Sequence, residues 1–111
     1  MEESILISIK KLLGIAREYS HFDTDVIIHI NTAFMSLNQL GVGPKEGFSI
    51  KDEKTKWKDF INDERLNAVQ TYIYLKVKLV FDPPLNSSVL ESNKQMINEL
   101  EWRLNVQAES K

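Results

Sequence analysis

The chain of 111 residues contains no cysteine. Disulfide cross-links and thiolate-bound zinc, which stabilise many small domains, are therefore excluded. The absence of cysteine also fits a protein that is made in a reducing compartment. A core of apolar side chains must hold the fold together, and a domain of this length buries roughly two thirds of its unfolded surface.

Long apolar runs and an excess of positive charge are missing as well. No run approaches the roughly 20 apolar residues that cross a bilayer, and the first residues, Met1-Glu2-Glu3-Ser4, lack the basic region of a signal peptide. The formal net charge of −2 argues against a general affinity for nucleic acid or for anionic membranes. We therefore expect a soluble protein, made inside the cell, with no membrane partner.

Apolar residues at helical spacing predict four helices. The first spans 4–13, and the second spans 24–40 and ends where Gly41-Val42-Gly43-Pro44 cannot continue it. The third spans 64–81 and is apolar on two sides, so we expect it to be central. Asp82-Pro83-Pro84 ends it.

The fourth helix is expected to begin at Ser88-Val89-Leu90-Glu91, a pattern typical of a capping box. Its core face is expected to consist of Val89, Leu90, Met96, Ile97, Leu100 and Leu104. Residues 107–111 are expected to fray.

Residues 41–63 are the least regular part of the chain and hold three of its four glycines. A long excursion between helices is usually functional or mobile, and we expect a projecting loop or a short β-hairpin. The predicted fold is all-α: one domain over residues 1–111, a small bundle of about four helices with this projecting segment between the second and third long helices.

The stretch HFDTDVIIHI, residues 21–30, contains both histidines and two aspartates. His21 and His29 are eight residues apart and lack the i,i+4 spacing of a helical zinc site. Asp23 is expected to cap the second helix, and Asp25 to add favourable charge to its first turn. No residue pattern points to catalysis, so no catalytic residue, metal or cofactor is predicted.

Several large apolar side chains remain once the core faces are filled. Ile28 and Met35 lie about half a turn from the core face of their helix, and Trp102 lies on the back of the last helix. Ile7 is expected on the outer side of the first helix. Since Trp and Met are enriched at protein interfaces, we predict Ile28, Met35 and Trp102 as contact residues.

The chain resembles the small head–tail connector proteins of tailed bacteriophages and prophages of Gram-positive bacteria, also called head-completion or adaptor proteins. The similarity covers nearly the whole chain. It is carried by IKKLLGI, FDTDVIIHINTAFMSLNQLGVGP, GFSIKDEKTKWKDFI and LNAVQTYIYLKVKLVFDPPLNSSVLESNKQMINELEWRL. The most particular pieces are YIYLKVKLVFDPP and the closing ELEWRLN.

This resemblance implies a structural, non-enzymatic protein without a cofactor, made in the bacterial cytoplasm and placed at the head–tail interface of the virion. Its implied partners are the portal protein, a downstream connector, stopper or tail protein, and copies of itself in a ring, with DNA only as passing cargo. The segment after Trp102 is short for a docking arm. The loop at 41–63, with Trp57, would therefore supply more of the docking.

Two other functions compete with this interpretation. A small intracellular helical binding or regulatory module, such as a DNA-binding factor, would need a basic recognition helix. The nearest candidates, Lys76 and Lys78, flank a helix expected to be largely buried. An enzyme would need a concave site with converging titratable groups, which we would expect near His29.

Overall fold

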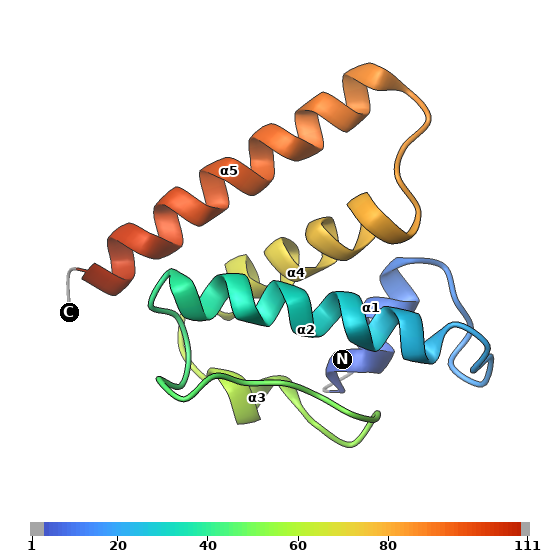
Figure 1. Ribbon diagram of the computed structural model, residues 1–111, viewed down its shortest axis with the longest axis horizontal. Coiled ribbons are helices and arrows are strands. Elements are labelled where there is room, and N and C mark those ends of the chain that lie inside the picture. Colours follow the sequence, from blue (N-terminus) through green and yellow to red (C-terminus); the bar gives the residue numbers. More distant parts are fainter. Residues whose placement is uncertain (1–3, 110–111) are drawn as a thin grey trace.

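The computed structural model describes residues 4–109 and is all-α, as predicted (Figure 1). Its helices are α1 (Ile5–Leu12), α2 (Asp23–Gln39), α3 (Trp57–Phe60), α4 (Leu66–Phe81) and α5 (Ser87–Glu109). Within residues 4–109 no β-strand forms, and β pairing is limited to an isolated antiparallel bridge between Ser4 and Lys56.

Helix α4 occupies the centre of the bundle and packs against α1, α2 and α5, as expected from its two apolar sides. Val69, Tyr72, Ile73 and Val77 on this helix are completely buried. A helix that is covered on several sides can use most of its circumference for core contacts. α4 ends with Asp82 as its C-cap, directly before the proline pair.

Helix α1 begins where the Ser4 side chain accepts a hydrogen bond from the backbone N–H of Ile7, at 3.2 Å. Ile7 itself is only 6% exposed, so its expected position on the outer side of the helix is wrong. The chain after α1 turns back at Gly14 and runs along this side, where residues 14–17 and Ile7 line the same hollow.

Residues 41–63 pack onto the bundle through buried apolar side chains, and the hairpin expected here is absent from this described segment. Its buried side chains are Val42, Ile50, Trp57, Phe60 and Ile61. Phe34 of α2 forms a cluster with Phe48 and Phe60, with ring centroids 4.7–5.0 Å apart. Asn31 fixes the middle of the segment by donating to the carbonyl of Ile50 and accepting from its N–H.

Two predicted helix caps are wrong. Asp23 is the first residue of α2 and makes no capping hydrogen bond, because its carboxylate turns to Lys10, 2.8 Å away. At the start of α5 the cap is Asn86, whose side-chain oxygen accepts from the N–H groups of Ser88 and Val89 at 2.8 and 3.2 Å. A cap two residues before Ser88 makes the predicted box unnecessary.

Helix α5 is peripheral. Among its 23 residues, all of which the structure describes, Ile97 and Leu104 are the two that are buried. Val89 and Met96, expected in the core, are 48% and 45% exposed, because α5 packs along a narrow stripe. The helix continues to Glu109, so residues 107–109 are not frayed, while residues 110 and 111 lie outside the described part.

Candidate functional site

The two histidines lie in different surroundings. His21 is exposed and packs edge-on against Phe22, with ring centroids 4.9 Å apart. His29 lines a hollow of about 140 Å³ between α2 and α4. Within residues 4–109 no three His, Cys, Asp or Glu side chains are grouped so that they could hold a metal ion.

Exposed apolar side chains are the most prominent surface feature. Ile28, Met35 and Trp102 are 55%, 65% and 67% exposed, which confirms their predicted position outside the core. Large apolar groups with this exposure are the side chains that protein contacts commonly bury.

Trp57 does not belong with these exposed residues. Its side chain is 3% exposed, and its indole N–H donates to the hydroxyl of Ser8 in α1 at 3.0 Å. The loop that carries Trp57 folds against α1 instead of projecting, and the backbone N–H of Ile5 donates to the carbonyl of Thr55 at 3.1 Å. Trp57 is therefore a core residue, which corrects its assignment as a contact residue in this fold.

Tyr72 connects the two helices that carry the exposed apolar residues. Its hydroxyl donates to the carboxylate of Glu101 in α5 at 2.7 Å. Burial, together with the hydrogen bond and the charge of Glu101, raises the pKa of Tyr72, while a hydrogen bond with the Ser36 hydroxyl of α2 opposes the shift. The phenol thus stays protonated, and its hydrogen bond with Glu101 joins α4 to α5.

Met35 and Trp102 are sequence neighbours of Ser36 and Glu101, the two residues that interact with Tyr72. Met35 precedes Ser36 and Trp102 follows Glu101, and α2 and α5 run in the same general direction (Figure 1). At 100° per residue, both side chains turn away from Tyr72, and Trp102 lines a hollow with Ala68 of α4 and with Arg103, Val106 and Gln107 of α5.

Ile28 lies one heptad before Met35 on the same side of α2. We use the name α2–α5 face for Ile28, Met35 and Trp102, the three large apolar side chains of α2 and α5 that are more than half exposed.

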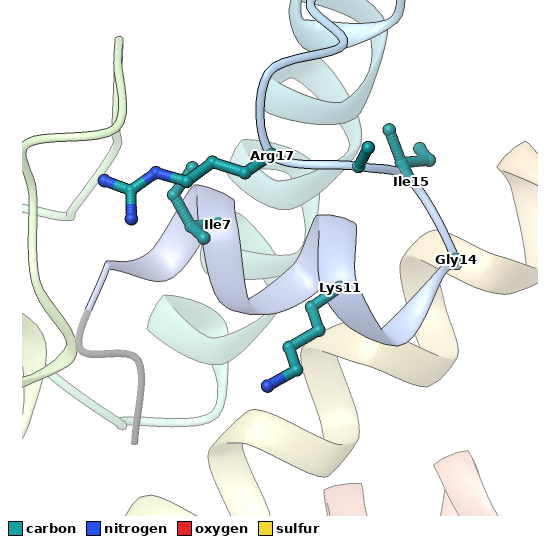
Figure 2. A pocket seen from close by; sticks show the side chains of 6 residues that line it. Ile7, Lys11, Gly14, Ile15 and Arg17 are labelled. Atoms are coloured by element: carbon teal, nitrogen blue, oxygen red, sulfur yellow. The ribbon is translucent and has the colours of Figure 1, made fainter.

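A second surface feature lies on α1 (Figure 2). The α1 pocket, of about 510 Å³, is lined by Ile7 and Lys11 of α1 and by Gly14, Ile15, Ala16 and Arg17 of the chain that follows. Its interior is mainly apolar, and the two cationic side chains, Lys11 and Arg17, lie on different sides of it. Arg17 also forms an exposed ion pair with Glu53, at 3.2 Å.

No sequence pattern indicated the α1 pocket. Residues 15–22 lack helical or strand periodicity, and their path depends on hydrogen bonds with Lys10 of α1. The Nζ of Lys10 donates to the carbonyl oxygens of Arg17 and Tyr19 at 3.0 and 2.8 Å. A buried lysine at an otherwise regular helical position is the one signal that could have indicated this folded-back segment.

The family model for phage connector proteins matches residues 5–111. The chain belongs to the phage connector protein family. The match covers every helix described above, so the core and both surface features lie within the family's domain.

Membership gives the connector a role at the head–tail junction of a phage particle, within a structural family whose members contact other phage head and tail proteins. No curated protein and no solved structure matches the chain. Within residues 4–109, no helix combines the length and the apolar character that a bilayer-spanning segment needs.

Proposed function

We propose that this connector docks on the portal protein and forms a ring that continues the DNA channel toward the tail. The observation that carries the proposal is the α2–α5 face, whose three apolar side chains are more than half exposed in a single chain. Family membership supports a partner from the virion for such a surface. Burial of Trp and Met at a subunit contact would remove this area from water.

The face of the proposed ring that points away from the portal would bind a second connector, a stopper or a tail protein. The role is structural and involves no catalysis or cofactor. The net charge of −2 suits a channel wall that lets DNA pass, since a strongly basic wall would bind the phosphate backbone. The protein would be made in the host cytoplasm before it joins the particle.

A ring of identical chains requires a heterologous interface, in which two different patches of each subunit meet. The α2–α5 face would supply one patch, and the second patch must differ from it. We therefore expect isolated chains to be monomeric or weakly associated, with the portal acting as the template for ring closure. If light scattering at micromolar concentration shows a stable high-order oligomer of the isolated chain, the portal is not needed as a template for ring closure.

A pull-down with the portal protein of the same phage or prophage tests the proposal. We expect the connector to be retained, and the double variant Met35→Asp/Trp102→Asp to be lost, because each charge would be desolvated at the contact. Leu85→Asp, at a fully exposed position in the α4–α5 linker, is the matched control and should be retained. Absence of retention of the unmodified chain would overturn the proposal.

A further inference from the structure

We propose that the α1 pocket of one subunit receives the Trp102 edge of α5 from the next subunit in the ring. By the Trp102 edge we mean Trp102 and Val106, which are adjacent on α5 and 67% and 45% exposed. This inference rests on the proposed ring, and it identifies the partner of each surface.

The chemistry of the pocket suits an aromatic side chain at a subunit contact. Ile7, Ile15 and Ala16 supply apolar contacts, and about 510 Å³ is open for an entering group. Lys11 is exposed at the edge, where a cation can lie over the face of an indole. Tryptophan, with a large apolar ring and a polar N–H, fits a pocket that is apolar inside and exposed to solvent at its rim.

Charge complementarity points to the same pairing. Residues 87–109 of α5 contain four acidic and two basic side chains, a net charge of −2. Lys11, Arg17 and Glu18 are the exposed charged side chains of residues 4–22, which build the pocket, and their net charge is +1, since Lys10 is buried in its ion pair with Asp23. Opposite charges attract the two segments and hinder pairing of either segment with its own copy.

The position of the two surfaces decides between a ring and a dimer. α4 lies between α1 and α5 and packs against both, so the pocket and the Trp102 edge belong to different sides of the bundle. Contact between such sides is head-to-tail, and it repeats from subunit to subunit until a ring closes.

The smaller hollow at His29, Lys76 and Val80 competes for the same tryptophan. This hollow lies between α2 and α4, and its volume of about 140 Å³ is far smaller than that of the α1 pocket.

The native chain lacks cysteine, so single cysteines report the contact directly. We would mix the variants Lys11→Cys and Val106→Cys, oxidise them on portal particles and also free at high protein concentration, and identify dimers by mass spectrometry. We expect a cross-link in the mixture and none in either variant alone. Trp102→Ala introduced into the Val106→Cys chain should lower the yield about tenfold or more.

Cross-links of Val106→Cys with itself or with Met35→Cys, or no Lys11–Val106 cross-link under either condition, would overturn the inference. Retention of the unmodified chain on portal is measured separately in the same samples. Loss of retention contradicts the proposed function, whereas retention without the Lys11–Val106 link contradicts the pairing alone. Circular dichroism of Trp102→Ala verifies that the helices remain.

Discussion

Lys10 of α1 and Asp23 of α2 form an ion pair that joins the two ends of the first interhelical connection. The Nζ of Lys10 lies 2.8 Å from a carboxylate oxygen of Asp23, and the lysine side chain is 1% exposed. Its hydrogen bonds go to the carbonyl oxygens of Arg17 and Tyr19. One buried cation therefore fixes the segment that forms the wall of the α1 pocket.

Lys10→Met should destabilise the connector by about 3 kcal/mol, because it leaves a carboxylate and two carbonyl oxygens without their partner. The Asp23 side chain is 30% exposed, so water can solvate part of its charge in the variant. The expected loss of stability is therefore at the lower end of the range for breaking a buried ion pair. Urea unfolding measures the change. Lys11→Met, at the exposed neighbour, should stay within about 0.5 kcal/mol, and equal losses in both variants would contradict this role of Lys10.

Gly43→Ala should destabilise the fold more than Gly47→Ala. Both glycines have positive φ, +88° and +94°, so an alanine is strained at either position, by about 1–3 kcal/mol. At Gly43 the added Cβ would also come within 2.4 Å of a ring carbon of Phe60, whereas at Gly47 it meets no atom within 4 Å. Thermal unfolding compares the two, and the difference between them isolates the contact with the buried ring.

Truncation of Trp57 should lower stability, whereas truncation of Trp102 should mainly lower binding. Trp57→Ala removes a buried indole and its hydrogen bond to Ser8, with an expected loss of about 3–5 kcal/mol. Trp102→Ala should change stability by less than about 1 kcal/mol but weaken portal binding. Iodide quenching of fluorescence in each variant gives an independent check. The Trp57→Ala chain should be quenched strongly and the Trp102→Ala chain weakly, and the reverse would contradict the assignment.

Tyr72→Phe should change how stability depends on pH in alkaline solution. The pKa of Tyr72 is raised in the folded state, chiefly by burial and then by Glu101. Above the usual tyrosine pKa of about 10, the unfolded chain releases this proton while the folded chain keeps it, so folding stability falls as pH rises. The Tyr72→Phe variant has no phenol at this position, so its folding stability should decrease less as pH rises. Urea unfolding from pH 8 to pH 11 measures the slope, with the exposed Tyr19→Phe as the control, and parallel curves for Tyr72→Phe and the unmodified chain would contradict the prediction.

Helix positions were predictable because strong local signals agree with the packing. The proline pair after Asp82 stops α4 in any context, and the apolar periodicity of α2 and α4 matches the faces that they bury. The i,i+4 pair of Glu99 and Arg103 also forms as its spacing implies, with a 3.0 Å contact.

The errors arose where contacts distant along the chain override a local pattern. Asp23 has the sequence context of a helix cap, but Lys10 provides an opposite charge that local reasoning cannot locate. Trp57 is in a polar, charged stretch, and only the return of that stretch to α1 buries its ring. The α1 pocket was missed for the same reason, whereas the exposure of Met35 and Trp102 follows from helical phase alone.

Electron microscopy of portal particles with added connector tests the central claim most directly. We predict a ring of connector density coaxial with the portal, with a central opening continuous with the portal channel and α1 of each subunit against α5 of its neighbour. Particles that bind no connector, or that bind single copies at scattered positions without a ring, would contradict the account.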